Sequence, residues 1–140
     1  MSDETTFSTF ETELQVRPDD IDLNGHVHNS KYLDYVLAAR FDQMERCYHM
    51  SMTEFLDRGL TWFVKAAFIE HKRPLFMGDW MIVKTRIADV QQRGVRVSYE
   101  ILRRDTNKLS AIGYFDYTLI NTETGRATDI PEDIIAKYSV

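Results

Sequence analysis

A carboxylate, an amide and an imidazole stand at alternate positions, Asp22, Asn24 and His26, in the stretch over residues 17–30. This stretch has no apolar periodicity and leads directly into a segment that does have helical periodicity. The first amide groups of a helix have no partner within the helix, and the helix dipole leaves partial positive charge there. The sequence therefore predicts reactive side chains at a helix N-terminus, where an oxyanion can be stabilised.

Two other interpretations of the same residues need to be weighed. Asp, Asn and Gly before a helix also form ordinary turns and helix caps. Residues 20–25 match the opening of a calcium-binding EF-hand loop, which has oxygen ligands at alternate positions. However, the position of the bidentate glutamate is occupied by Lys31, and Pro18 interrupts the helix that should enter such a loop. The turn interpretation stays open, and calcium binding is disfavoured.

The histidines and the cysteine have simpler explanations than metal binding or nucleophilic chemistry. His26 and His28 stand one residue apart, as metal ligands can, but no third ligand accompanies them nearby in the sequence. Cys47, the only cysteine, lies at the end of the expected helix, and this position favours a packing role. We therefore expect no metal site and no cofactor.

Length and composition indicate one globular domain. The chain has 140 residues, of which 44% are hydrophobic, and we expect residues 1–140 to form a single domain with 1–6 as a loose tail. The formal net charge of −5 argues against nonspecific binding of nucleic acid. Neither a signal peptide nor an apolar run of roughly 18 residues that could span a membrane is recognisable. These features favour a cytoplasmic protein.

Hydrophobic periodicity divides the chain into helices and strands. Residues 7–16 alternate as a first strand, which ends before Pro18, and residues 32–48 have the period of a long amphipathic helix. Short helices are expected at 51–58 and 132–138. Segments rich in β-branched and aromatic residues predict four further strands over residues 60–71, 79–90, 95–104 and 109–120. Short turns join these strands, so they should pair as antiparallel hairpins.

This order of elements predicts an α+β fold in which one antiparallel sheet of about five strands wraps around one long central helix. That is the hotdog arrangement. Residues 22–32 resemble the signature of hotdog-fold acyl-CoA thioesterases of the 4-hydroxybenzoyl-CoA thioesterase-like family, through Asp22, Gly25, His26, Val27, Asn29 and Tyr32. His28 stands where that family usually has asparagine. Residues 73–79 are similar to the Pro-Leu-x-x-Gly-Asp turn of the same family.

The resemblance implies that the protein hydrolyses an acyl-CoA or acyl-carrier-protein thioester to a free acid and a thiol. Asp22 would act as the base or as the nucleophile, with Asn24 and His26 positioning the reacting groups. The oxyanion would be held by backbone amides, which we expect to be those of His28, Asn29 and Ser30. A second branch of hotdog thioesterases uses a carboxylate on the central helix, but Glu45 is better explained as a solvent-facing residue.

Apolar and basic residues later in the chain are candidates for substrate binding. An acyl group could be lined by aromatic and thioether side chains near the turn at residues 74–78, namely Trp62, Phe63, Phe76 and Met77. For the CoA phosphates, the resemblance places a basic cluster beside the hairpin at Gly94, where Arg93 and Arg96 stand, with Arg73 as a further contributor. CoA is then part of the substrate and not a cofactor.

The family resemblance also leaves two other functions open and bears on the oligomeric state. The chain could be a noncatalytic acyl or CoA binder, or a hotdog hydratase or dehydratase. Hydratases of this fold carry a proline after the asparagine of their signature, where this chain has Gly25. Because an open sheet leaves edge groups unpaired, we expect a homodimer or homotetramer in which residues 59–68 complete the pocket of the partner subunit.

Overall fold

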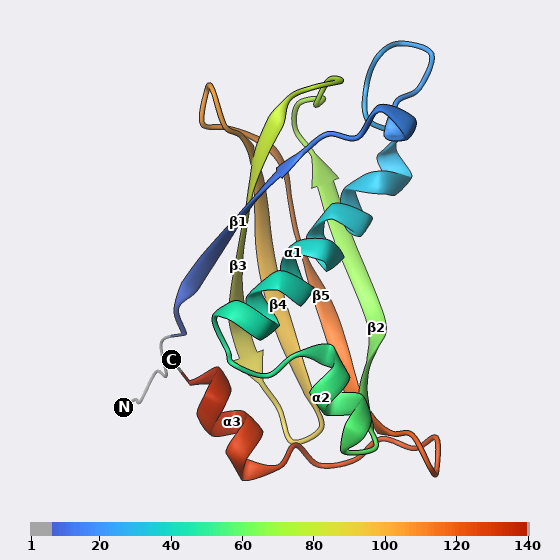
Figure 1. Ribbon diagram of the computed structural model, residues 1–140, viewed down its shortest axis with the longest axis vertical. Coiled ribbons are helices and arrows are strands. Elements are labelled where there is room, and N and C mark those ends of the chain that lie inside the picture. Colours follow the sequence, from blue (N-terminus) through green and yellow to red (C-terminus); the bar gives the residue numbers. More distant parts are fainter. Residues whose placement is uncertain (1–6, 140) are drawn as a thin grey trace.

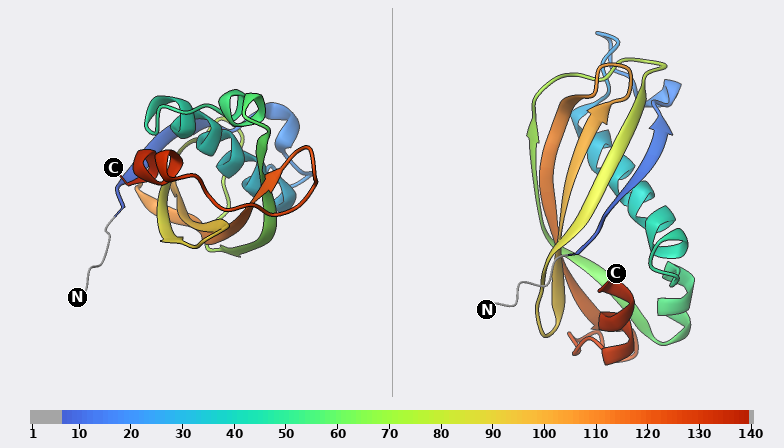
Figure 2. Two further views of the ribbon diagram at one scale, coloured as in Figure 1. Left: turned by 90° about the horizontal axis from the view of Figure 1, so that it is seen from below. Right: turned by 90° about the vertical axis from the view of Figure 1, so that its left-hand side faces the viewer.

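The computed structural model describes residues 7–139, so the expected tail over 1–6 lies outside the described residues. A five-stranded antiparallel sheet in the order β1-β3-β4-β5-β2 curves around the long helix α1 (Figures 1 and 2). The strands are β1 Thr9–Gln15, β2 Leu60–His71, β3 Trp80–Val90, β4 Gly94–Arg103 and β5 Lys108–Asn121. The helices are α1 Tyr32–Arg46, α2 Met52–Asp57 and α3 Glu132–Tyr138, with single 3₁₀ turns η1 Pro18–Asp20 and η2 Asn29–Lys31. This confirms the predicted α+β hotdog arrangement.

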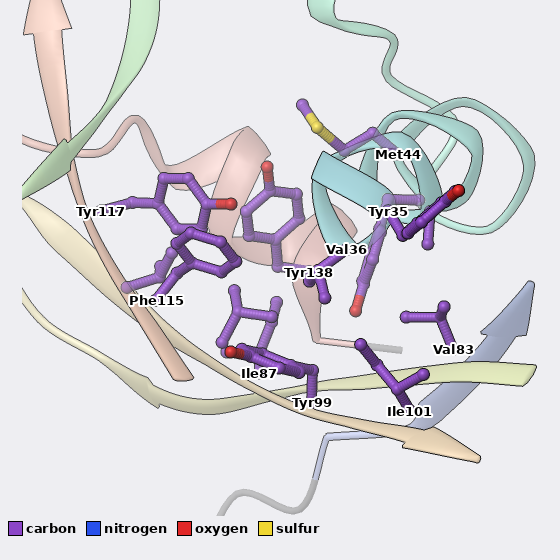
Figure 3. Packing of buried hydrophobic residues seen from close by; sticks show 14 of the residues in the cluster. Tyr35, Val36, Met44, Val83, Ile87, Tyr99, Ile101, Phe115, Tyr117 and Tyr138 are labelled. Atoms are coloured by element: carbon purple, nitrogen blue, oxygen red, sulfur yellow. The ribbon is translucent and has the colours of Figure 1, made fainter. Parts of the chain in front are cut away.

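Helix α1 buries one apolar stripe against the concave face of the sheet. Val36 on the helix belongs to the same buried cluster as Val83 on β3 and Ile101 on β4 (Figure 3). The helix ends at Arg46, slightly before the last apolar residue of the periodic segment. His49, in the following turn, has a positive φ of 58°, which does not continue a right-handed helix. The helical period therefore predicted the apolar stripe of α1, whereas the turn at His49 determines where the helix ends.

One polar side chain lies in the centre of this otherwise apolar contact. Gln43 on α1 is 0% exposed, and its amide nitrogen donates to Thr12 Oγ1 on β1 at 3.1 Å. The Thr85 hydroxyl on β3 donates to the Gln43 carbonyl oxygen. A buried amide is tolerated only when its groups are paired, so this network fixes α1 in one register over the sheet.

Strand β2 is the edge strand that carries the most exposed apolar surface. It pairs only with β5 in the described chain, and residues 63–68 are exposed along its middle. Phe63 and Phe68 are among its large exposed side chains. A long edge strand with apolar side chains is a surface on which another strand can pair.

The C-terminal helix covers one end of the sheet, away from the loop that precedes α1 (Figure 2). Ile134 and Tyr138 of α3 are buried, and the Trp62 indole nitrogen donates to the Tyr138 hydroxyl at 3.1 Å. The end near Trp62 is therefore closed by packing. Among the helices that the structure describes, none combines the length and apolarity needed to cross a membrane.

Candidate active site

A buried carboxylate holds the loop between β1 and α1 in place. Asp20 is 4% exposed, and its Oδ2 accepts from the Tyr35 hydroxyl at 2.6 Å and from Arg17 Nε at 2.9 Å. The hydrogen bond from Tyr35, followed by that from Arg17, holds the pKa of Asp20 below its ordinary value. Asp20 therefore anchors the loop to the first turn of α1 as a charged group.

Asp22 is held in a different way. Its Oδ1 accepts from the backbone amides of Asn24 at 2.8 Å and His26 at 3.1 Å, while Oδ2 accepts no hydrogen bond from residues 7–139. Burial acts to raise the pKa of Asp22, but the two amide hydrogen bonds outweigh it and the pKa lies below its ordinary value. The turn interpretation is thus correct for one carboxylate oxygen. The second oxygen is ionised and free for another partner.

The tight turn that follows Asp22 depends on a glycine. Gly25 has a φ of +78°, in the left-handed region, and its amide donates to the Asp22 carbonyl at 3.1 Å. The Asp22 amide in turn donates to the His26 carbonyl at 2.8 Å. These bonds close the loop on itself and place the His26 ring beside the Asp22 carboxylate.

Asp22 opens into a hollow of about 390 Å³ at the N-terminal end of α1. The loop, the start of α1 and the segment after β2 contribute the residues that line it: Asp22, His26, Val27, Asn29, Tyr32, His71, Lys72, Arg73 and Pro74. A carboxylate, two imidazoles and two cations therefore share one open space. His71, Lys72 and Tyr32 were not predicted as lining residues, because their approach to the loop depends on the packing of β2 beside α1.

Two aromatic contacts join the loop and the start of α1 to the end of β2 and the segment that follows it. The His26 ring packs edge-on against Phe76 with 4.9 Å between ring centroids, and the Tyr32 ring packs against His71 at the same separation. The Leu75 amide donates to the Tyr32 hydroxyl at 3.1 Å. The two stretches that carried the family resemblance, residues 22–32 and 73–79, are thus in direct contact.

The backbone amides at the start of α1 only partly match the expectation. The His28 amide donates to the Asp20 carbonyl at 2.9 Å, so its expected availability for an oxyanion is wrong. The amides of Asn29 and Ser30, at the start of η2, donate to no acceptor within residues 7–139. Two of the three expected amide donors are therefore free, and the third is used to fix the loop.

Several other predicted site residues lie outside this hollow. Asn24 is exposed and holds Asp22 through its backbone, while Met77 and Phe63 are exposed on the turn after β2 and on β2 itself. Trp62 lies toward the opposite end of β2, against α3. The structure therefore does not bring Asn24, Trp62, Phe63 or Met77 to the Asp22 hollow within one chain.

A second hollow, of about 370 Å³, adjoins the first and shares Arg73 and Pro74 with it. The remaining residues that line it are Phe76, Arg103, Thr106, Lys108 and Ser110. Arg73 donates to the Leu109 carbonyl at 3.1 Å. Phe76 and Arg73 therefore line a hollow next to that of Asp22, and their roles toward acyl group and CoA stay predictions. Arg103 and Lys108 were missed because the sequence places them in a hairpin with no distinguishing motif.

Arg93 and Arg96 were expected near the substrate, but they lie elsewhere in the chain. Arg93 Nε pairs with Asp129 at 2.9 Å, and Arg96 makes two hydrogen bonds to Asp116, at 2.7 and 2.9 Å. The hairpin between β3 and β4 is at the end of the sheet opposite the loop before α1 (Figure 1). Both guanidinium groups are thus paired within the chain and distant from Asp22.

The remaining chemical candidates are also placed by the structure. No three His, Cys, Asp or Glu side chains in residues 7–139 come together as a metal-binding group. Burial raises the pKa of the Cys47 thiol, which disfavours the nucleophilic thiolate. Glu45 is exposed on the outer face of α1, as expected.

Known proteins resemble this chain in sequence and in fold. Residues 16–138 match the sequence model of the Thioesterase-like superfamily. The long-chain acyl-CoA thioesterase FadM of Escherichia coli (strain K12) is 20% identical over 127 residues, which cover 91% of this chain and 95% of FadM.

Two solved structures illustrate the likeness in fold. The hypothetical protein TT1821 from Thermus thermophilus is 30% identical, with a TM-score of 0.85 over 92% of this chain and 96% of that one. The DHNA-CoA thioesterase from Staphylococcus aureus is 20% identical, with a TM-score of 0.87 over 94% and 89% of the respective chains. The described fold is therefore one that thioesterases use.

Proposed function

The chain belongs to the Thioesterase-like superfamily, and from this premise we propose that it hydrolyses acyl-CoA thioesters at the Asp22 hollow. One observation carries the assignment of the site. The Asp22 carboxylate is ionised, is held through Oδ1 and leaves Oδ2 without a partner among residues 7–139, at a hollow that Asn29 also lines, and the amides of Asn29 and Ser30 likewise donate to no acceptor in those residues. A base or nucleophile and a pair of oxyanion donors are the two parts that acyl transfer from a thioester requires.

As a general base, Asp22 would take a proton from water while the water oxygen attacks the thioester carbonyl carbon. The carbonyl oxygen becomes an oxyanion and is stabilised by the amides of Asn29 and Ser30. When the intermediate collapses, the carbon–sulfur bond breaks, and the CoA thiolate takes the proton back from Asp22. As a nucleophile, Asp22 would instead form a mixed anhydride, which water then hydrolyses.

The second hollow is the proposed place for the CoA phosphates. Arg73, Arg103 and Lys108 line it, and Arg73 also reaches the hollow that holds Asp22. Cations in a hollow that adjoins the one holding Asp22 suit a substrate with a charged carrier at one end and a thioester at the other. SAV2348 from Staphylococcus aureus, a protein of similar fold, was solved in complex with CoA.

We also propose that two copies pair through the free edge of β2. Its exposed apolar side chains, Phe63, Val64 and Phe68, would be covered by such pairing. The segment that lines the Asp22 hollow follows directly after β2, so a partner strand would lie near the site. Residues 59–68 would then contribute to the neighbouring subunit's pocket, and sedimentation at micromolar concentration should show a dimer or a tetramer.

A cytoplasmic location is part of the same proposal. The unpaired Cys47 and a CoA thioester substrate both suit a reducing compartment. Fractionation of cells that express the native protein would test it.

The decisive experiment is a thiol-release assay over short, long and aromatic acyl-CoAs. A thioesterase releases free CoA from at least one of them, a noncatalytic binder binds without release, and a hydratase changes an enoyl chain while the thioester stays intact. Chelator should not alter the rate, because no step of the proposed reaction uses a metal. Absence of CoA release from every substrate in the panel would contradict the proposed function.

A further inference from the structure

Arg40, in the third turn of α1, is buried without a counter-ion. It is 3% exposed, and its Nε and Nη1 are enclosed without a hydrogen-bond partner. Elsewhere in residues 7–139, arginines pair with carboxylates at Arg17, Arg46, Arg58, Arg93, Arg96, Arg103 and Arg104. Arg40 has no such pair. Since arginine stays protonated in proteins, an uncompensated buried guanidinium is costly and calls for a partner that completes it.

Arg40 is one of the residues that line an apolar hollow of about 100 Å³ between α1, α2, β2 and β5. The other residues that line this hollow are Leu37, Phe41, Met44, Met52, Trp62, Val64 and Tyr117. Its walls are therefore hydrocarbon and aromatic surface, and Arg40 is the only charged group among them. A ligand that fits such a space is an apolar chain that carries an anion at one point.

The neighbouring phenols cannot serve as that anion. Arg40 lies over the Tyr48 ring, 5.5 Å from the centroid; the Tyr138 ring packs against Tyr48 at 4.9 Å, and Tyr117 lines the same hollow. The Arg40 charge acts to lower the pKa of all three phenols, but burial has the larger effect. Burial raises the pKa of Tyr48, Tyr117 and Tyr138, so these hydroxyls stay neutral at physiological pH. The ring offers a cation–π contact, which compensates the charge only in part.

We propose that this hollow receives the far end of the acyl chain and that Arg40 binds a carboxylate carried there. The preferred substrates would then be CoA thioesters of dicarboxylic acids. This inference rests on the proposed function. A carboxylate can accept two parallel hydrogen bonds from a guanidinium, which a methyl end cannot, and removal from water strengthens the pair. The axial rise along α1 from Tyr32, beside Asp22, to Arg40 is about 12 Å, a distance that an extended acyl chain can span.

The first test compares kcat/KM for length-matched pairs of substrates that end in a carboxylate or a methyl group. The pairs are adipoyl with hexanoyl, suberoyl with octanoyl, and sebacoyl with decanoyl CoA. At the optimal length, the carboxylate end should be preferred by about tenfold or more, the effect of a charge-assisted hydrogen bond. Arg40→Met should abolish this preference, whereas Arg86→Met, which removes an exposed charge on β3, should preserve it.

The second test measures binding without catalysis. Sebacate should raise the Tm of the full chain more than decanoate does, and Arg40→Met should remove the difference. This variant should fold, because it replaces a buried unpaired charge with an apolar side chain. Arg40→Lys keeps the charge without the planar fork and should retain a reduced preference.

The outcomes separate the inference from the function on which it rests. Equal kcat/KM for both members of every pair would overturn the Arg40 assignment and leave thioester hydrolysis standing. Dissociation of the oligomer by Arg40→Met, with an unchanged substrate preference, would also overturn it and would assign the counter-ion to a second copy of the chain. If no acyl-CoA is hydrolysed, the proposed function fails, and the Tm comparison still decides whether Arg40 binds a dicarboxylate.

Discussion

Asp20 and Asp22 stand two positions apart in the same loop, yet the structure gives them opposite surroundings. Asp20 is buried and receives hydrogen bonds from Tyr35 and Arg17, while Asp22 is partly exposed and uses one oxygen on backbone amides. Both carboxylates have a pKa below the ordinary value. They differ in whether an ionised oxygen is left free at a hollow. A lowered pKa alone therefore does not distinguish an anchoring carboxylate from a reactive one.

The same distinction applies to the cations of the molecule. Arg96 is paired with Asp116 on the neighbouring strand, whereas Arg73 borders both hollows and makes a hydrogen bond only to a backbone carbonyl. A side chain whose hydrogen bonds are complete within the chain stabilises the fold. A side chain that keeps unused capacity beside a hollow is available to a ligand. Substitutions of Asp22, Asp20, Arg73 and Arg96 test whether unused hydrogen-bonding capacity distinguishes ligand-binding side chains from structural ones.

Asp22→Asn should have the largest effect. The amide keeps the shape of the side chain and the loop but is a poor base and a poor nucleophile, so kcat/KM for acyl-CoA should fall by about 10³-fold. Thiol release under substrate-limiting conditions measures this. Asp19→Asn is the matched control, because Asp19 is an exposed carboxylate of the same loop. Wild-type turnover in Asp22→Asn would move the chemistry to another group.

Asp20→Asn should act mainly on stability. It removes the charge that Tyr35 and Arg17 surround, and the loss should lower the free energy of unfolding by about 1–3 kcal/mol. Urea unfolding of Asp20→Asn, Tyr35→Phe and the double variant measures the coupling between the two groups. Activity should decline because the loop that carries Asp22 is held less firmly. Additive effects of the two substitutions would show that the 2.6 Å contact does not stabilise the protein.

The sequence predicted the elements and the loop well because both depend on local patterns. The strands and the long helix follow from periodicity and turn residues, and the two motifs over residues 22–32 and 73–79 follow from the resemblance, but their mutual contact was not predicted. The role of Asp20 could not be predicted, because Tyr35 reaches it from the far side of the loop and only α1 packing brings the two together. The same packing explains why the His28 amide donates to the Asp20 carbonyl.

Basic residues were predicted less well, for a physical reason. Arg93 and Arg96 beside a hairpin look available in a sequence, but antiparallel pairing puts Asp116 directly opposite Arg96. Such partners are set by strand register, which one sequence does not specify at single-residue accuracy. Arg40 is the converse case. The sequence assigned it with other charged residues to the polar face of the long helix, and this was wrong, because the structure buries it to 3% exposure and leaves it without a counter-ion in the described chain.

Acid should weaken the wild type through Asp20. Because the pKa of Asp20 is lowered on folding, its contribution is present above the unfolded-state pKa of about 3.9 and is lost as pH falls through the folded-state pKa. The Tm difference between the wild type and Asp20→Asn should therefore be constant near neutral pH and shrink below about pH 4. Thermal unfolding over this range measures it. A constant difference down to pH 2 would show that folding does not lower the pKa of Asp20.

Arg73→Gln should have a moderate effect on substrate binding. Arg73 borders the Asp22 hollow and the basic hollow beside it, so its removal should raise KM for acyl-CoA by about threefold to fivefold with kcat nearly unchanged. The screening of exposed charges keeps the expected effect small, and raising the salt concentration should reduce it further. An unchanged KM would place the CoA phosphates elsewhere.

Arg96→Gln should have the smallest effect, since the guanidinium is already bound by Asp116 and lies over the Tyr114 ring, 4.0 Å from its centroid. We expect KM within about twofold of the wild type and a change of less than about 1 kcal/mol in the free energy of unfolding, as for an exposed ion pair. Asp116→Asn removes the same pair from its other side and should give the same small change in stability. The opposite result would be that Arg96→Gln raises KM as much as Arg73→Gln does and that Asp116→Asn lowers KM. In that case CoA and Asp116 compete for the Arg96 guanidinium. Because Arg96 is remote from Asp22 within one chain, that CoA would have to be bound to another subunit, and a paired guanidinium would then be no less available to a ligand than a free one.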